Sequence, residues 1–391
     1  MKKLRVGIIG TGSVVREIYR HLYFHSEYSH LLSIEAAADP YTKGLNEFCE
    51  EGGIPKDRRF SSYEEMIGKV ELDAVQVNTP DCLHEAPVVF ALRAGLDVVV
   101  PKPLSDTIGA AHQMISAARE SGRLLGVDFH KRDDPRIKEA AARYRNGEYG
   151  DFQAAVWYMI DKLLVADPNH EPRFFASPDF AEKNSPISFL TVHMADAFIQ
   201  IVGLKPVAVR ANGWRQKLPS LKPVAVAGYD LCDTEVRFDN GGVAHIITGW
   251  HLPNAAHATT VQSGRIICTD GMLDLGLDMP GYHELGKEGI QERNPLFRNF
   301  ESDGTVTGYG MSHPGRLYQK VIRDREGRLS EEERRRMASP VELGFWTTAV
   351  LEAAERSLAG GEAADNGAVR GKEISIAGLL EAELGADAKN Y

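Results

Sequence analysis

Residues 5–15 read RVGIIGTGSVV, an apolar run that breaks at Gly10-Thr11-Gly12. The run before the break is typical of a buried parallel strand, and the residues after it follow a helical pattern to about Leu22. A strand, a glycine turn and a helix in this order make the first unit of a parallel α/β sheet. Further strands of this kind are predicted at 32–38, 74–77, 97–100 and 124–128, with helices between them.

The pattern changes after Pro135, where strand-like runs dominate. They lie at 152–159, 207–212, 233–238, 243–250 and 259–268, and helices are predicted at 188–202 and 340–358. The fold class is therefore α/β, with an N-terminal Rossmann, doubly wound parallel sheet over 1–131. A C-terminal α+β domain with a large mixed or antiparallel open sheet is predicted over 132–391. The helix at 340–358 is a candidate to pack back toward the N-terminal domain.

Bulk properties restrict the class of protein. A chain of 391 residues with 43% hydrophobic and 26% charged residues suits two globular domains. The formal net charge of −10 argues against nucleic acid or an anionic membrane surface as a partner. The cysteines, at 49, 82, 232 and 268, have neither zinc nor disulfide spacing, so we expect a reducing, cytoplasmic compartment. The dispersed histidines predict no metal site, and no G-x-S-x-G motif indicates a serine hydrolase.

The glycine turn predicts a dinucleotide site. Backbone N–H groups of Gly10, Thr11, Gly12, Ser13 and Val14 are candidates to face a pyrophosphate at the start of the helix. The third glycine of the usual G-x-G-x-x-G motif is replaced by Val15, a position that mainly sets helix–strand packing. A purely structural glycine turn is the alternative.

Asp39 strengthens this interpretation. It ends the second predicted strand, where a carboxylate can accept hydrogen bonds from the ribose hydroxyls and repel a 2′-phosphate, so NAD is favoured over NADP. It lies 29 residues after Gly10, against about 20 in the motif, which predicts an extended connection at 23–30. A capping aspartate before Pro40 is the alternative.

The run from Asn78 to Pro103, NTPDCLHEAPVVFALRAGLDVVVPKP, resembles the Gfo/Idh/MocA oxidoreductases. Their pattern is V-x-T-P-x-x-x-H, a helix, and then A-G-x-x-V-x-x-E-K-P. Residues 126–135, GVDFHKRDDP, are similar to the family's G-F-x-x-R-x-x-P segment. The resemblance implies a cofactor held between a Rossmann domain and a C-terminal open sheet, with homo-oligomers forming through that sheet. It also implies a sugar-like substrate. The candidate cofactor contacts it adds are Asn78, Thr79, Pro80, His84 and Lys102.

Lys102 is the first candidate catalytic residue. It lies at the carboxyl end of a strand, where open α/β sheets place ligands, and a desolvated lysine can take part in removing a hydroxyl proton. An ordinary surface lysine between Pro101 and Pro103 is the alternative. The family usually has glutamate before this lysine, and here that residue is Pro101.

The second catalytic segment of the family reads G-G-x-x-x-D-x-G-x-H-x-x-D, and residues 184–196, NSPISFLTVHMAD, are its counterpart. His193 is the candidate base, and Asp196 is a candidate substrate contact or a structural residue. The aspartate four residues before the histidine is replaced by Phe189. A histidine that only hydrogen-bonds within the core is the alternative.

Further residues are candidate substrate contacts. Arg173 lies in a polar loop, and either Trp157 or Tyr158 on a strand can stack on a sugar. The segment 309–318, YGMSHPGRLY, is glycine-rich and polar, and it can either close over a substrate or form a plain loop. The remaining candidates are His130 and His313.

The residues and the resemblance together predict an NAD-dependent dehydrogenase or reductase acting on a secondary alcohol of a sugar, glycoside or cyclitol. An insertion at 281–310 is expected to enlarge its pocket. Two alternatives remain open. One is an NAD-retaining glycosidase that works by transient oxidation, and the other is an NAD-binding regulator without chemistry, which the loss of both acids (Pro101 and Phe189) favours.

Overall fold

The computed structural model describes residues 3–175, 177–278, 282–286, 289–292 and 294–391. Its chain divides into two compact units, each built from two separate stretches of sequence. Unit 1 comprises 1–134 and 296–348, and unit 2 comprises 135–295 and 349–391. A single boundary at residue 131 is therefore wrong, because the chain returns to the N-terminal unit after residue 295. Among the described residues, no helix is both long and apolar enough to cross a membrane.

Unit 1 contains a parallel sheet of six strands in the order β3-β2-β1-β4-β5-β6. The order reverses between β1 and β4, which makes the adjoining strand ends the switch point of a Rossmann sheet. Its strands are β1 (Leu4–Ile9), β2 (Leu32–Ala38), β3 (Arg59–Phe60), β4 (Ala74–Val77), β5 (Asp97–Pro101) and β6 (Leu125–Asp128). The helices between them are α1 (Arg20–Phe24), α2 (Thr42–Glu51), α3 (Tyr63–Lys69), α4 (Glu85–Arg93) and α5 (Ile108–Ser121).

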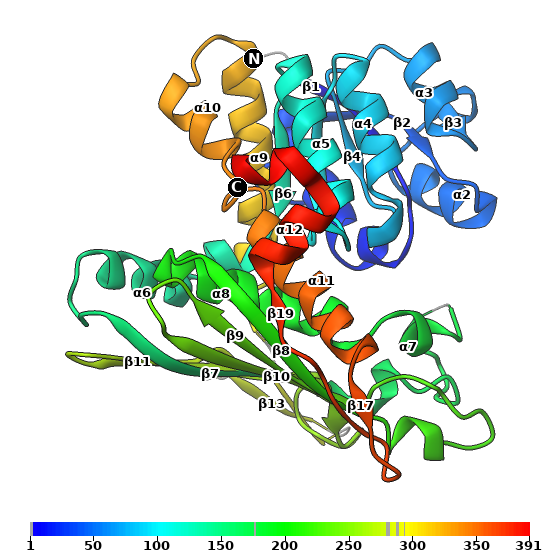
Figure 1. Cartoon of the computed structure of the whole chain (residues 1–391). Coiled ribbons are helices and arrows are strands. Elements are labelled where there is room, and N and C mark those ends of the chain that lie inside the picture. Colours follow the sequence, from blue (N-terminus) through cyan, green and yellow to red (C-terminus); the bar gives the residue numbers. More distant parts are fainter. Residues whose placement is uncertain (1–2, 176, 279–281, 287–288, 293) are drawn as a thin grey trace. The chain divides into compact units, whose positions relative to one another are not determined.

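Two further helices complete unit 1, α9 (Tyr309–Arg325) and α10 (Glu331–Met337), with a short hairpin of β15 (Asn299–Phe300) and β16 (Val306–Thr307) before them. They are drawn in yellow and orange beside the blue and cyan N-terminal elements (Figure 1). Helix α9 packs on β5 and β6 and beside α1. Its end near Arg325 binds Asp97 at the start of β5, while its first turns approach the end of β6. The helix therefore runs antiparallel to the strands that it covers.

Unit 2 is built on a mixed sheet of nine strands in the order β12-β11-β7-β10-β9-β8-β18-β17, with β19 also paired to β8. Among the described strands of this sheet, β7 and β10 pair in parallel and the other pairs are antiparallel. The strands are β7 (Phe152–Lys162), β8 (Pro206–Trp214), β9 (Leu231–Phe238), β10 (Val243–Leu252), β11 (Thr260–Cys268), β12 (Met272–Gly276), β17 (Glu362–Ala363), β18 (Ala368–Arg370) and β19 (Ile374–Ser375). A separate hairpin pairs β13 (His283–Gly286) with β14 (Gly289–Glu292). The expected α+β architecture is confirmed.

The helices of unit 2 include α6 (Pro135–Arg145) and α8 (Val192–Val202), which pack together on one face of the sheet (Figure 1). The others are α7 (Phe180–Lys183), α12 (Ile376–Leu384) and most of α11 (Phe345–Ala359), which begins in unit 1. The helix expected at 340–358 therefore starts five residues later. The insertion expected at 281–310 lies partly outside the described residues.

Candidate functional site

The carboxyl edge of the parallel sheet collects most of the candidate residues of unit 1. Strands β1, β2, β4, β5 and β6 all end at this edge because they run in the same direction. The residues at or just after these ends are Gly10, Asp39, Asn78, Thr79, Lys102 and Asp128. Open α/β sheets bind their ligands outside this edge, next to the switch point. We refer to these residues and their turns as the cofactor edge.

The glycine turn has the geometry that an anionic group needs. Gly10 has φ +86°, and a Cβ there would lie 2.8 Å from the backbone oxygen of Asn78, so only glycine fits. Gly12 is exposed, and a Cβ placed on it would meet no described atom within 4 Å. The helix starts at once, since the N–H of Arg16 donates to the Gly12 carbonyl at 3.1 Å. The N–H groups of its first turn have no partner within the helix, and such groups are the usual donors to a pyrophosphate.

Asp39 is tied to the glycine turn. Its Oδ2 accepts hydrogen bonds from the N–H of Thr11 at 2.7 Å and the Thr11 hydroxyl at 3.0 Å, and its Oδ1 accepts from the N–H of Tyr41 at 2.7 Å. A carboxylate has about four acceptor positions, so Asp39 retains capacity for a ribose hydroxyl. The long connection between Gly10 and Asp39 contains the end of α1 and a 3₁₀ turn at Ser29–Leu31. These elements form the extended connection that the spacing predicted.

The two polar residues of the β4 loop hold the turns together. The Asn78 side chain is 6% exposed; it donates to the Gly10 carbonyl at 3.4 Å and accepts from Gln76 at 2.9 Å. His84 is fully buried, and its two ring nitrogens face the carbonyl oxygens of Thr79 at 2.9 Å and Leu104 at 3.1 Å. The expectation that His84 contacts the cofactor needs correction, because its ring is buried and both ring nitrogens face backbone carbonyl oxygens. Thr79 and Pro80 remain at the accessible end of the loop.

Lys102 is half-buried directly after β5, between Pro101 and a cis-linked Pro103. Burial raises the pKa of Asp81 in the neighbouring loop, and the charges of His84 and Lys102 oppose this rise. Lys102 and Asp81 therefore interact electrostatically. The lysine is therefore held at the cofactor edge in partly desolvated surroundings, which is the setting that a proton-handling amine requires.

His130 follows β6 and packs within unit 1. Its ring stacks on Tyr309 with centroids 6.0 Å apart and lies 5.3 Å from the ring of Phe297. Burial lowers the pKa of His130 to about 3, with Lys131, Lys102 and His313 acting in the same direction and Asp128 opposing them. The imidazole is therefore neutral at physiological pH. Its expected contact with substrate stays a prediction.

A buried group that the sequence did not reveal lies beside these residues. Asp128, at the end of β6, is 2% exposed and accepts hydrogen bonds from the Tyr19 hydroxyl at 2.7 Å and from Nδ1 of His313 at 2.8 Å. His313 lies on helix α9 and is 8% exposed, so the expectation of a loop at 309–318 is wrong. Asp128 could have been predicted, because it ends a predicted strand at the ligand-binding edge. Its partners could not, since they lie 109 and 185 residues away.

In unit 2, the second candidate segment begins with a π-helical turn at Ile187–Thr191 and continues as α8. His193 is half-buried on this helix, and Asp196 is 2% exposed. Phe189 lies in the π-helical turn, with its ring 5.1 Å from Phe180 and 5.7 Å from Trp250. The residue that replaces the family's aspartate thus anchors an aromatic cluster.

The other two candidate residues of unit 2 differ in exposure, since one is buried and one is exposed. Trp157 is fully buried, packs edge-on against Phe198 at 6.0 Å, and fills the space beside Gly264. The prediction that Trp157 stacks on a substrate is therefore wrong, because alternation along β7 turns it toward the face covered by α8. Arg173 is exposed in its loop, and its proposed contact with substrate stays a prediction.

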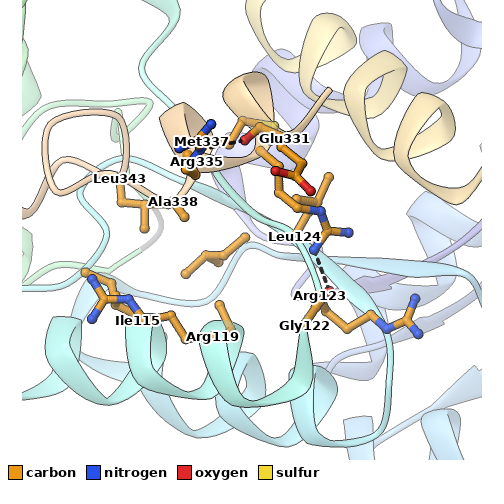
Figure 2. A pocket seen from close by; sticks show the side chains of 13 residues that line it. Ile115, Arg119, Gly122, Arg123, Leu124, Glu331, Arg335, Met337, Ala338 and Leu343 are labelled. Carbon is orange, nitrogen blue, oxygen red and sulfur yellow. Dashed lines mark hydrogen bonds between the residues drawn. The ribbon is translucent and has the colours of Figure 1, made fainter. Parts of the chain in front are cut away.

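A hollow of about 410 Å³ in unit 1 lies away from the cofactor edge. It is bordered by α5 and by the segment carrying Glu331, Met337 and Leu343 (Figure 2). Gly122 and Leu124 on its wall precede β6, so the hollow adjoins the amino end of that strand. Ligands of open α/β sheets bind at the carboxyl ends, and we do not assign this hollow to the cofactor.

Comparison with known proteins agrees with this geometry. Residues 4–129 match the model of the oxidoreductase family GFO_IDH_MocA, described by its NAD-binding Rossmann fold. D-glucoside 3-dehydrogenase of Escherichia coli K12 is 25% identical over 64% of this chain and 71% of its own length. 1,5-Anhydro-D-fructose reductase of Ensifer adhaerens is 41% identical, but the match covers only 22% of this chain and 25% of that reductase.

The fold is also that of solved structures. The scyllo-inositol dehydrogenase from Lactobacillus casei, with bound NAD(H) and scyllo-inositol, superposes with a TM-score of 0.69. The superposition covers 94% of this chain and 99% of that one at 18% identity. At this identity the likeness concerns the fold.

Proposed function

We propose that this chain, whose residues 4–129 match the oxidoreductase family GFO_IDH_MocA with its NAD-binding Rossmann fold, transfers hydride between NAD and a secondary alcohol. The observation that carries this proposal is the joint placement of the glycine turn, Asp39 and Lys102 at one edge of one sheet. Bound NAD would supply the hydride acceptor or donor. The N–H groups of Gly12, Ser13 and Val14 would hold its pyrophosphate, whereas those of Gly10 and Thr11 already donate to Ala38 and Asp39, contrary to expectation. Asp39 would bind the ribose hydroxyls.

The oxygen of the reacting hydroxyl needs a group that stabilises it as the hydride leaves, and Lys102 is the candidate for this catalytic role. Its ammonium would donate a hydrogen bond to the hydroxyl oxygen and stabilise the negative charge that grows there as hydride leaves. His193 on α8 is a second candidate acid–base residue.

The substrate class we propose is a sugar, glycoside or cyclitol. Support comes from the names of similar proteins, which include a D-glucoside 3-dehydrogenase, a 1,5-anhydro-D-fructose reductase and inositol 2-dehydrogenases. The compounds in these names have a ring carbon that bears a secondary hydroxyl or the corresponding ketone, which is the group that the proposed reaction needs.

A single assay separates this function from its alternatives. The protein is mixed with NAD and a panel of sugars, polyols and glycosides while the absorbance of reduced nicotinamide is recorded and the products are analysed. Net formation of NADH supports the dehydrogenase. Cleaved glycoside without net NADH would instead indicate an NAD-retaining glycosidase, and tight NAD binding without any product would indicate a regulator.

We also propose a homo-oligomer formed through the sheet of unit 2. Ala154 on β7 lies opposite Ile267 on β11, which lies opposite Met272 on β12, so the three share one face. Ile267 is 44% and Met272 50% exposed, and Val156 on the same face is 50% exposed. Such an apolar patch on an open sheet supports self-association. Light scattering during size exclusion would test it: Met272→Lys should shift the mass toward the monomer.

For the compartment, we propose the cytoplasm. All four cysteines are free thiols, and three of them are buried, as is usual in a reducing environment. Fractionation of the source cells, with detection of the native protein by antibody, tests this assignment.

A further inference from the structure

Asp128 lies next to Pro101, one of the two residues that replace an acid of the family pattern. Pro101, which stands where the family has glutamate, is the register partner of Asp128 on the adjacent parallel strand. Register partners on neighbouring strands direct their side chains to the same face, and strands lie about 4.8 Å apart. A carboxylate missing from the end of β5 is thus present one strand away, at the end of β6.

The hydrogen bonds of Asp128 indicate which ring nitrogen of His313 carries a proton. An ionised carboxylate only accepts hydrogen bonds, so Nδ1 of His313 carries the proton that it donates at 2.8 Å. The Tyr19 hydroxyl donates to the other carboxylate oxygen at 2.7 Å and fixes its orientation. Nε2, on the other side of the ring, is not the nitrogen that Asp128 binds. It is therefore the ring nitrogen that could face a substrate.

We propose that Asp128 and His313 form an acid–base pair at the cofactor edge, in which Nε2 of His313 takes the proton of the substrate hydroxyl. The inference rests on the proposed function and deepens it. Oxidation of the alcohol breaks its C–H and O–H bonds and forms the carbonyl double bond. The proton would pass to Nε2 of His313, and bound NAD would supply the acceptor for the hydride. Asp128 stabilises the resulting imidazolium, as a carboxylate does in other Asp–His pairs. In the reductive direction His313 returns the proton.

Charged groups around the pair favour this assignment. Lys102 after β5, His130 and Lys131 after β6, and Glu342 lie within electrostatic range of Asp128, His313 or His130. The Tyr19 and Tyr318 hydroxyls, whose pKa values are raised by burial and by Asp128, stay protonated. Asp128 is therefore the carboxylate hydrogen-bonded to His313, in surroundings that also contain Lys102, Lys131 and the Glu342 carboxylate.

The first test is kinetic and uses the substrate found in the panel assay. His313→Asn should lower kcat at least 100-fold while KM and the Kd for NAD stay within about threefold, as expected for the loss of a general base. Added imidazole should restore part of the activity of His313→Ala. Asp128→Asn should lower kcat by a similar factor, because it permits the wrong tautomer. Normal kcat in His313→Asn, or a loss that imidazole leaves unchanged in His313→Ala, would overturn the proposal.

A matched control exists in unit 2. His245 on β10 also pairs through Nδ1 with an aspartate, Asp233, at 3.2 Å, but on an exposed part of the sheet. His245→Asn should leave kcat within about twofold. A loss as large as that of His313→Asn would show that the effect is not specific to the proposed pair.

The second test needs no substrate and separates failure of this pair from failure of the proposed function. Nitrogen-15 NMR of the imidazoles in the free protein should show His313 among the histidines in the Nδ1–H tautomer, with its signal assigned by comparison with His313→Asn. That signal should vanish in His313→Asn and change tautomer in Asp128→Asn. If wild type oxidises nothing in the panel, the proposed function fails, and the tautomer still decides this inference. An Nε2–H tautomer for His313 overturns it.

Discussion

Pro101 on β5 and Asp128 on β6 are register partners at the carboxyl edge of the parallel sheet. The proline removes the carboxylate that the family pattern places before its lysine, and the neighbouring aspartate provides one on the same face. Asp128 accepts hydrogen bonds from Tyr19, at the end of the π-helical segment Val15–Tyr19 that precedes α1, and from His313 on α9. The departure from the family pattern is thus accompanied by a charge elsewhere at the same edge, which argues for a working site rather than a lost one.

Lys102→Met should abolish turnover and leave the affinity for NAD within about threefold, because the role proposed for the lysine is on the reacting hydroxyl and the other cofactor contacts remain. Stopped-flow assays and calorimetric titration measure the two quantities. Lys69→Met is the control, since Lys69 forms an exposed i,i+4 pair with Glu65. An active Lys102→Met enzyme would remove this residue from the chemistry.

Asp39→Ala should weaken NAD binding about tenfold, or ~1.4 kcal/mol, and should bring the affinities for NAD and NADP closer together. The carboxylate both accepts from Thr11 and repels a 2′-phosphate. Titrations of both dinucleotides check this, with the exposed Asp57→Ala as control. Selectivity that is unchanged in Asp39→Ala would place the ribose elsewhere.

Two glycines with similar φ separate backbone strain from steric clash. Gly53 has φ +64° and open space around it, so Gly53→Ala should cost about 1 kcal/mol of unfolding free energy. Gly10→Ala adds a contact of 2.8 Å with Asn78 and should cost about 3 kcal/mol or more. Urea unfolding monitored by circular dichroism compares them. Equal losses would mean that the turn can relax away from β4.

The lowered pKa of His130 predicts that the free energy of unfolding decreases in acid. The unfolded chain takes up this proton near pH 6.5, whereas the folded protein does so only near pH 3. Stability should therefore fall as the pH drops through this window. His130→Gln removes the difference, so its Tm should depend less on pH between 6.5 and 4 than that of wild type. The exposed His30→Gln is the control, and parallel curves for His130→Gln and wild type would contradict the prediction.

The sequence was sufficient for the local units of the fold and insufficient for their long-range partners. The strand, glycine turn and helix around Gly10 are determined by neighbouring residues, and the strands of unit 2 followed from alternation. Helix α9 was missed because its first turns contain Gly310, Pro314 and Gly315, which disfavour a helix locally. Gly315 is needed where the Tyr28 ring approaches, a contact that no local pattern reveals.

Side-chain direction limited the prediction of the site in the same way. Alternation along β7 places Trp157 and Tyr158 on opposite faces, but only the packing of α8 shows that Trp157 is the buried one. The cofactor edge was predictable because all the parallel strands end there. The pairing of Asp128 with Tyr19 and His313 was not, since three separate segments meet at that point.

Calorimetric titration of NAD into wild type and Gly12→Val tests the central claim most directly. A Cβ on Gly12 meets no described atom within 4 Å and its backbone is not strained, so the variant should fold with an unchanged Tm. Its side chain would nevertheless fill the space where the pyrophosphate is proposed to lie. We predict one NAD bound per wild-type chain and affinity lowered at least 30-fold, or ~2 kcal/mol, in the variant. Equal affinity in both proteins, or no binding by wild type, would contradict the account.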